Sequence, residues 1–291
     1  MTPGELFESL ADATWHRLAD GAELGVRQGE TSVTDYLLLE IARLRHPAIR
    51  LRKTKQNEED TQGTDWEWWI GTPWQGWMRY AIQAKRGHVG DGKYDQLGHR
   101  VRDELQAEIL DRYSTANGAT PLYCLYNSVD RRDFRPFWHC KRPMEPEQLG
   151  CSIAPFNAIY DALNTRGARH FDWVHTWGDD KKRCLPWRCL LRCPAFIGIF
   201  KPGLSPKDHN HYIGGLSEFF GRAPRFYRSL PRGLPFNSDF PAIAELNAEE
   251  LDPEYYNFDL NLWPRRIAVV DVSQEVDAIA RETEAKDKEN P

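Results

Sequence analysis

The chain has 291 residues, of which 41% are hydrophobic and 28% are charged, and its formal net charge at pH 7 is −5. This composition excludes a disordered chain, because it supplies enough apolar side chains for the core of one or two domains. We find no apolar run of about 18 residues and no basic segment followed by an apolar stretch. The sequence therefore predicts no membrane span and no secretory signal, and we expect a cytoplasmic protein.

Two helices are predicted at the start of the chain. Apolar side chains recur at three- and four-residue steps from Asp12 to Leu24 and again from Asp35 to Leu44. Thr34 is the expected N-cap of the second helix, and Pro47 ends it.

Three strands, a helix and a fourth strand follow. Residues 48–53 alternate apolar with basic side chains, residues 65–70 are rich in Trp, and residues 77–85 are the expected partner strand. A helix over residues 94–113, ended by Gly118, leads to a short apolar strand over residues 121–126. The order predicts the α/β (α+β) class, with a mixed sheet and helices against its faces.

The second half of the chain is rich in proline and is predicted to be rich in loops. We expect a helix over residues 150–163, strands over 195–200 and 266–272, and a surface loop over 202–212. The charged stretch 278–291 reads as a frayed helix or a disordered tail. Three units are thus expected: an N-terminal core over residues 1–127, an elaboration packed on it over 128–277, and the tail.

A group of polar side chains is expected where two of these strands meet. Asp65 opens the second strand, and Gln83 and Lys85 lie two positions apart near the end of the third, so their side chains point to the same face. Carboxylates that hold Mg²⁺ suit phosphodiester hydrolysis, because negative charge must be neutralised and a water activated. Gln83 offers only a neutral carbonyl oxygen, so a metal needs carboxylates from elsewhere.

Asp65 and Gln83-Ala84-Lys85, in this order of elements, resemble the PD-(D/E)XK nuclease superfamily. They are more closely similar to its Mrr-like branch, in which the acid of the E-x-K element is often Gln. Residues 29–127 also resemble an uncharacterised bacterial family with an Asp-Trp-Glu-Trp-Trp strand followed by Gln-Ala-Lys. The resemblance implies a restriction-endonuclease-like αβββαβ core and an endonuclease that uses Mg²⁺ or Mn²⁺, with a role in defence against phage.

The resemblance also implies roles for individual residues. Asp65 would be the main metal ligand, Gln83 a weak ligand, and Lys85 the catalytic cation. A further acid from the preceding helix completes such sites, and here Glu40, inside the predicted helix, competes with Glu30, just before it.

Three more polar residues are weaker expectations. Glu67 shares the strand of Asp65 and is expected to reach the metal. Glu59 lies in the turn before Asp65, and Gln106 lies on the helix after Lys85, where related nucleases have a Gln that orients the site.

Basic residues on both sides of these motifs predict a nucleic-acid surface. Arg52, Lys53, Arg86 and Lys93 are the residues that we expect on the phosphate backbone, with double-stranded DNA as the partner. A solvated strand or helix face would show similar charge. Scission of both strands would favour a homodimer.

Two other classes of function stay open. A nucleic-acid-binding module of the same fold that has lost cleavage is compatible with Gln83 in the place of an acid. A zinc-stabilised protein would use Cys184, Cys189 and Cys193 with His139 or Cys140, but the paired Cys-x-x-Cys spacing is absent and free cysteines also pack as small hydrophobes.

Overall fold

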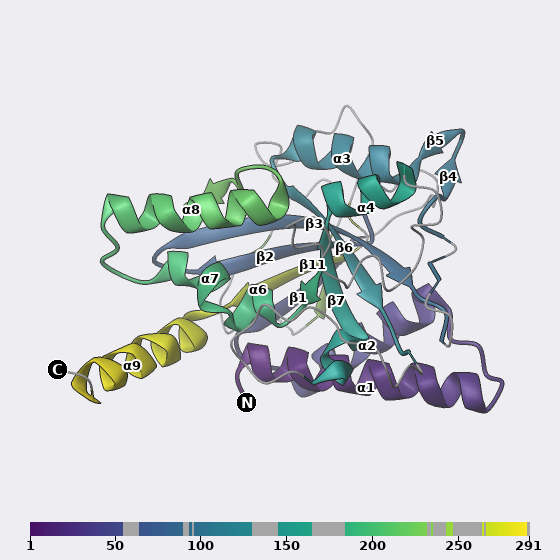
Figure 1. The fold of residues 1–291 in the computed structure, drawn as a ribbon, viewed down its shortest axis with the longest axis horizontal. Helices are drawn as coiled ribbons and strands as arrows, with labels where there is room; N and C mark the ends of the chain where they lie inside the picture. The colour runs from purple at the N-terminus through teal and green to yellow at the C-terminus, as the bar shows by residue number, and fades with distance from the viewer. Residues whose placement is uncertain are drawn as a thin grey trace.

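The fold is a large mixed β-sheet with helices packed on its faces (Figure 1). The computed structural model describes residues 1–54, 64–89, 93–94, 96–129, 145–164, 184–231, 234, 243–246, 264 and 266–289. No helix in these ranges is long and apolar enough to cross a membrane.

Helices occur along the whole described chain. The α-helices are α1 (Pro3–Glu23), α2 (Glu30–Leu44), α3 (Gln106–Asn117), α4 (Phe156–Asn164), α6 (Cys189–Arg192), α7 (Pro194–Ile197), α8 (Pro206–Phe220) and α9 (Ser273–Glu289). Two short 3₁₀ helices are η2 (Pro146–Gly150) and η3 (Gly198–Phe200).

The strands of the main sheet come from both halves of the chain. They are β1 (Ile49–Thr54), β2 (Trp66–Thr72), β3 (Gly76–Arg86), β6 (Thr120–Tyr126), β7 (Cys151–Pro155), β8 (Leu185–Pro186), β9 (Phe226–Tyr227), β10 (Ile243–Leu246) and β11 (Arg266–Asp271). A separate small hairpin joins β4 (Arg100–Val101) to β5 (Glu104–Leu105).

The order across the main sheet is β10-β1-β11-β2-β3-β6-β7-β8, with β9 paired to β3. β2 and β3 are antiparallel neighbours, as expected, and β6 is parallel to β3 with α3 as the crossover. β11 lies between β1 and β2, so a strand from the end of the chain sits in the middle of the sheet. The sheet therefore runs across the boundary at residue 127 that the sequence suggested.

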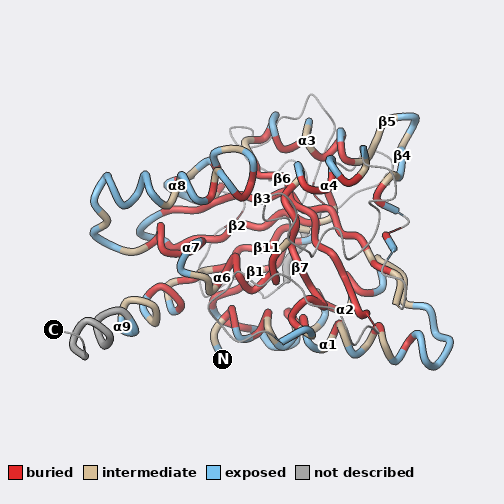
Figure 2. The backbone as a smooth tube through the Cα atoms, in the orientation of Figure 1, coloured by how far each residue is buried: buried red, intermediate tan, exposed pale blue. Residues whose placement is uncertain are grey.

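The core lies on both faces of the sheet. Alternate residues of β2 and β3, among them Trp68, Ile70 and Tyr80, face a cluster that includes side chains of α1, α2, α6, α7 and α8. The opposite face packs against α3 and α4. Figure 2 shows β2, β3, β6 and β7 almost entirely buried, whereas the helices alternate between buried and exposed residues. This pattern follows from strands that are covered on both faces.

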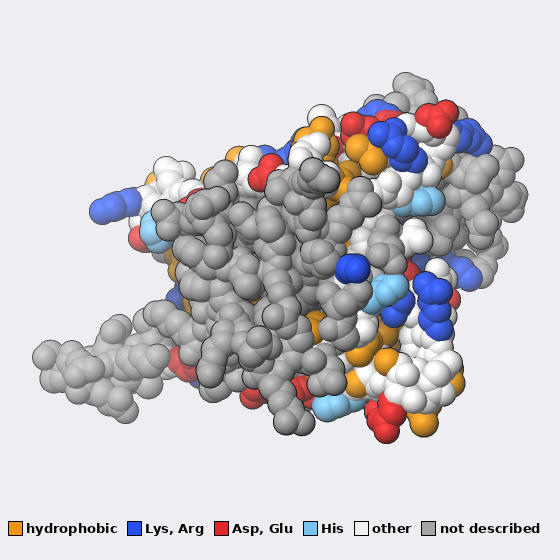
Figure 3. All heavy atoms as spheres, turned by 45° about the vertical axis from the view of Figure 1, so that its right-hand side comes forward, with side chains coloured by type: hydrophobic (Ala, Val, Ile, Leu, Met, Phe, Trp, Pro, Cys, Tyr) orange, Lys and Arg blue, Asp and Glu red, His pale blue; other side chains and the backbone are white. Residues whose placement is uncertain are grey.

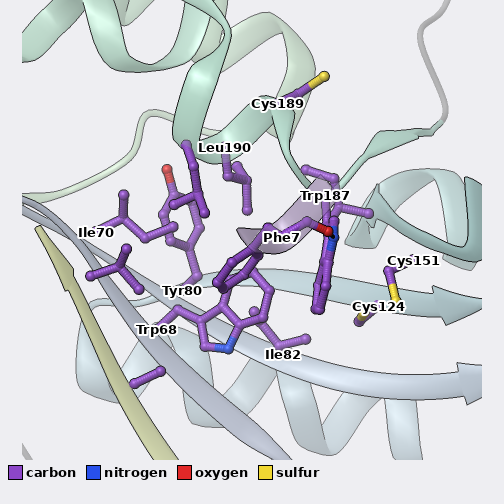
Figure 4. Close-up of a cluster of buried hydrophobic side chains, with 14 of the residues drawn as sticks. Phe7, Trp68, Ile70, Tyr80, Ile82, Cys124, Cys151, Trp187, Cys189 and Leu190 are labelled. Atoms are coloured by element: carbon purple, nitrogen blue, oxygen red, sulfur yellow. Dashed lines mark hydrogen bonds between the residues drawn. The ribbon is translucent and has the colours of Figure 1, made fainter. Parts of the chain in front are cut away.

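Aromatic rings fill the face of the sheet under α1. The ring of Phe7 lies 5.4 Å from Trp68 and 4.5 Å from Trp187, centroid to centroid (Figure 4). The indole Nε1 of Trp187 donates a hydrogen bond of 2.6 Å to the Phe7 carbonyl oxygen. These contacts fix α1 against the sheet, because the buried indole keeps a polar partner while its ring packs.

The order of elements over residues 1–127 is confirmed, but several boundaries differ. α1 begins at Pro3, where Thr2 forms a capping box with Glu5. α2 begins at Glu30 rather than after Thr34, and the Thr34 hydroxyl bonds the Glu30 carbonyl oxygen instead of capping the helix. The helix predicted from residue 94 begins only at Gln106.

Local backbone chemistry explains the late start of α3. Arg102 and Asp103 both have positive φ, 48° and 66°, which form the tight turn of the β4–β5 hairpin and exclude a helix there. Gly118 ends α3 with a φ of 63°, as predicted.

The second half holds most of the wrong predictions. Residues 195–200 form α7 and η3 instead of a strand, and residues 206–212 belong to α8 instead of a loop, because Ser205 caps that helix and Pro206 begins it. The predicted helix 150–163 divides into β7 and α4. The strand at 266–272 is confirmed, and residues 273–289, which include much of the predicted tail, form α9.

Candidate active site at the end of strand β3

The end of β3 extends beyond the start of β2 and leaves room for a polar site. The register pairs Trp66 with Ile82, so Gln83, Ala84 and Lys85 continue past the last paired residue of β2 while β6 still pairs with them on the other side. The overhanging backbone of β3 therefore needs hydrogen-bond partners other than a β2 strand.

Asp65 supplies one of those partners. Its backbone N–H donates to the Ile82 carbonyl oxygen at 3.0 Å, and its carboxylate oxygen Oδ2 accepts from the Ala84 N–H at 2.9 Å. The Gln83 side-chain amide donates to the same oxygen. The buried hydroxyl of Thr64 also bonds the Ile82 carbonyl oxygen, so the start of β2 is anchored from two positions. The predicted proximity of Asp65 and Gln83 is confirmed.

Lys85 and Glu30 form the second half of the site. The Nζ atom of Lys85 lies 3.5 Å from Oε1 of Glu30, and the two side chains are 4% and 27% exposed. Burial raises the pKa of Glu30, the Lys85 charge lowers it, and the Asp65 charge raises it. A backbone hydrogen bond from Arg86 also reaches this carboxyl group. Glu30, Asp65, Gln83 and Lys85 therefore form one cluster.

The structure decides between the two acids of the second helix. Glu40 lies ten residues after Glu30, or about 15 Å further along α2, and its carboxylate pairs with Arg43 at 2.8 Å. Glu40 is therefore a wrong prediction, and Glu30 is the helical acid of the cluster. Glu30 lies outside the helix predicted from the sequence, because that helix starts with Thr34 as its N-cap, whereas α2 starts at Glu30.

Glu67 is also a wrong prediction for the site. Its carboxylate is fully buried and accepts hydrogen bonds from Arg79 at 2.7 Å, from Tyr113 at 2.6 Å and from the indole of Trp69 at 2.7 Å. The Glu67 side chain packs beneath α3. Asp65 lies in a bend before β2, so the alternation of β2 does not extend to Asp65, and the two acids do not share a face.

The other expected site residues lie in different surroundings. Glu59 lies outside the described residues. Gln106 begins α3, and its side-chain Oε1 is buried without a hydrogen-bond partner in the described part of the chain. Gln106 is not joined to the cluster by any hydrogen bond within those residues, so its role stays a prediction.

Tyr123 lies near the cluster, although no pattern in the sequence points to it as a site residue. It pairs with Gln83 in the register of β6, its side chain is buried, and the charges of Asp65 and Glu30 add to the effect of burial in raising its pKa. Its hydroxyl has no hydrogen-bond partner in the described ranges. Only the parallel pairing of β3 with β6 could reveal this proximity.

The four expected DNA-contacting residues are not equivalent. Arg52 is only 2% exposed, and its Nη1 donates to the Leu51 carbonyl oxygen, so the prediction that it lies on an open nucleic-acid surface is wrong. Lys53 and Lys93 are exposed, and Arg86 is partly exposed at the end of β3.

The cysteine alternative receives no geometric support. Cys189 is buried in one core cluster, with Cys193 packed against it, whereas Cys184 packs against another. Within the described residues no three His, Cys, Asp or Glu side chains are placed to hold a metal ion. His139 and Cys140 lie outside those residues. In the candidate site itself, the oxygen donors are the carboxylates of Glu30 and Asp65 and the side-chain amide oxygen of Gln83.

One comparison with known proteins gives a match. No curated protein and no solved structure matches the chain. A family model described as a family of unknown function (DUF6615) matches residues 3–277, which include the candidate site and all strands of the main sheet. The chain belongs to this family.

Proposed function

We propose that this protein is a metal-dependent endonuclease that hydrolyses phosphodiester bonds, with double-stranded DNA as its substrate and a restriction-endonuclease-like core. The observation that carries the proposal is the cluster of Glu30, Asp65, Gln83 and Lys85 at one end of β3. These residues come from a helix, a strand start and a strand end, which is the arrangement that the resemblance implies.

The oxygen atoms of the cluster suit a hard divalent cation. Mg²⁺ prefers one or two carboxylates together with neutral oxygens and waters. Asp65 and Glu30 would supply the carboxylates and Gln83 a carbonyl oxygen, since its amide N–H is the group that bonds Asp65. When bound there, Mg²⁺ would supply positive charge beside the scissile phosphate and favour deprotonation of a water.

The side chains of the cluster supply the other functions that the reaction needs, a fixed positive charge and a positioned carboxylate. Lys85, held by Glu30 and almost fully buried, places a fixed positive charge where the phosphate gains negative charge. Asp65 is fixed by two N–H donors, so the carboxylate stays in position without help from substrate. The order α2, β1, β2, β3, α3, β6 supports the core assignment, with β11 as an additional strand between β1 and β2.

Gln83 favours a second candidate function, a nucleic-acid-binding module that keeps the fold without cleavage. Because an amide carries no charge, the site has one carboxylate fewer than a site with an acid at this position. Under this alternative the cluster binds a phosphate through Lys85 but does not activate water.

Cleavage of supercoiled plasmid in Mg²⁺ or Mn²⁺ tests the proposal. Wild type should nick or linearise the plasmid, and Asp65→Asn and Lys85→Met should each lower the rate on the order of 10²-fold or more. Glu40→Gln is the matched control, because it removes a charge on the same helix as Glu30 but away from the cluster. Equal rates in all four proteins would refute the site, and DNA binding without cleavage by wild type would favour the binding module.

A further inference from the structure

A pocket adjoins the candidate site on the other side of the β3 backbone. It has a volume of about 370 Å³ and lies between the end of α1, the α1–α2 loop and the residues that follow β3. This volume falls in the range of about 300–1,000 Å³ typical of small-molecule sites. The proposed function does not use this pocket.

The pocket and the cluster share the backbone of Arg86. Arg86 follows Lys85, its backbone bonds the Glu30 carboxyl group, and its side chain lines the pocket. Alternation along β3 turns Arg86 to the face opposite Lys85. A ligand in the pocket would therefore lie beside the scissile phosphate and would not occupy the position of that phosphate at the cluster.

The lining combines two arginines and a histidine with apolar side chains. Arg27, Arg86 and His88 line the pocket together with Leu18, Val26 and Val89. On the face drawn in Figure 3, Lys, Arg and His side chains likewise gather beside hydrophobic ones at the right of the view. Among the described residues that line the pocket, none is acidic. Such a lining fits a ligand with a negative group and a flat apolar part, because guanidinium planes bind phosphate and also stack on bases.

The wall formed by the α1–α2 loop is built before any ligand arrives. Leu24, Gly25 and Val26 donate backbone hydrogen bonds to the last carbonyl groups of α1, so these carbonyls do not face the pocket unpaired. Gly25 has a φ of 70°. A Cβ at Gly21 would lie 2.8 Å from the Val26 carbonyl oxygen, so the close approach of loop and helix requires glycine there.

Gln28, another polar side chain of the lining, is held in place by a neighbouring arginine. Arg17 donates to the Gln28 side-chain oxygen at 3.1 Å, and its guanidinium lies 4.3 Å from the centre of the Tyr36 ring. Gln28 therefore presents its amide N–H₂ in a defined position two residues before Glu30. Fixed donors of this kind select for orientation as well as charge.

We infer that this pocket holds one unstacked nucleotide of the substrate strand, next to the phosphate at the cluster. The inference rests on the proposed function and deepens it, since it adds a contact to a base outside the duplex stack. Arg27 and Arg86 would bind its phosphate, and Leu18, Val26 and Val89 would pack against its base.

Binding measured without cleavage tests the inference separately from the nuclease activity. In the full-length Asp65→Asn protein, fluorescence anisotropy measures the Kd of a short labelled single-stranded oligodeoxynucleotide. Ala22→Trp fills the pocket from the exposed end of α1, and Leu24→Trp is the matched control, because Leu24 is 75% exposed and does not line the pocket. Ala22→Trp should raise the Kd by about ten-fold, and Leu24→Trp should leave it nearly unchanged.

Three results would overturn the inference. Unchanged oligonucleotide binding in Ala22→Trp means that the pocket holds no nucleotide of the substrate strand, and equal weakening in both Trp variants means that the effect is not local. Deoxynucleoside monophosphates form the second arm. If Ala22→Trp abolishes their binding but leaves oligonucleotide binding intact, the pocket takes a free nucleotide and not the substrate strand. Failure of wild type to cut plasmid contradicts only the proposed nuclease function.

Discussion

Glu30 and Lys85 form an ion pair, with 3.5 Å between Oε1 and Nζ, although they are 55 residues apart in the sequence. The first residue of α2 and the penultimate residue of β3 thereby meet at one edge of the sheet. The pair joins one acid of the cluster to its cation, and it decides which acid of α2 takes part.

Replacing Glu30 should weaken metal binding, whereas replacing Glu40 should not. Glu30→Gln removes a carboxylate beside Asp65, so we expect the affinity for Mn²⁺ to fall by about ten-fold or more. Isothermal titration of Mn²⁺ into the two variants and wild type measures this difference. Equal affinities in Glu30→Gln and Glu40→Gln would show that Glu30 is not a ligand.

The stability of the metal-free protein should depend on the ionisation of Glu30. Burial raises the pKa of this carboxyl group above its ordinary value of 4.5, so the folded chain binds the proton more tightly than the unfolded chain does. The contribution of Glu30 to stability is therefore full below an ordinary carboxyl pKa and is lost as the pH rises through the raised pKa.

Denaturant unfolding in chelator over a range of pH checks this sign. The free energy of unfolding of wild type, minus that of Glu30→Gln, should decrease from about pH 4 upward. A difference that stays flat or increases over that range contradicts the prediction.

The buried ion pair between Glu67 and Arg79 should matter for stability. Both side chains are fully buried and lie 2.7 Å apart, and Tyr113 joins them from α3. Glu67→Gln leaves the Arg79 charge without its carboxylate, so we expect a loss of about 3–5 kcal/mol in the free energy of unfolding.

An exposed ion pair provides the comparison for Glu67→Gln. Glu104 pairs with Arg112 at a site where the side chains are 34% and 47% exposed, and Glu104→Gln should cost about 1 kcal/mol or less. Urea denaturation of both variants measures the two losses. Similar losses in the two variants would mean that the buried pair has no special role.

The first 127 residues should not fold alone. β11 supplies the strand between β1 and β2. Without it, one edge of β1 and one edge of β2 lose their partner, and the core loses the side chains of Ile267 and Val269. A chain that ends at residue 127 should show no cooperative thermal transition by circular dichroism. A chain that ends at residue 282 should unfold cooperatively, because it keeps Val276 and Ile279 in the core.

Local pattern was sufficient for the first half of the fold. β1, β2, β3 and β6 are strands within two residues of the predicted limits, because their alternation, aromatic content and breaking residues act locally. The same reasoning failed at residues 195–200, where Pro194 starts a short helix in a run that is apolar because it is buried. An apolar run indicates that a segment is buried, but it does not distinguish a strand from a helix.

The sequence by itself determined the motif residues Asp65, Gln83 and Lys85 and the strands that carry them, since these depend on side-chain type and on alternation. Only the tertiary structure decided that Glu30 joins them, that Glu67 turns away beneath α3, that Tyr123 lies beside Gln83, and that β11 lies between β1 and β2. The physical reason is the distance along the sequence between the residues that interact. Strand and helix periods arise from neighbours in sequence, whereas register, helix start and strand order arise from contacts between segments far apart in the chain.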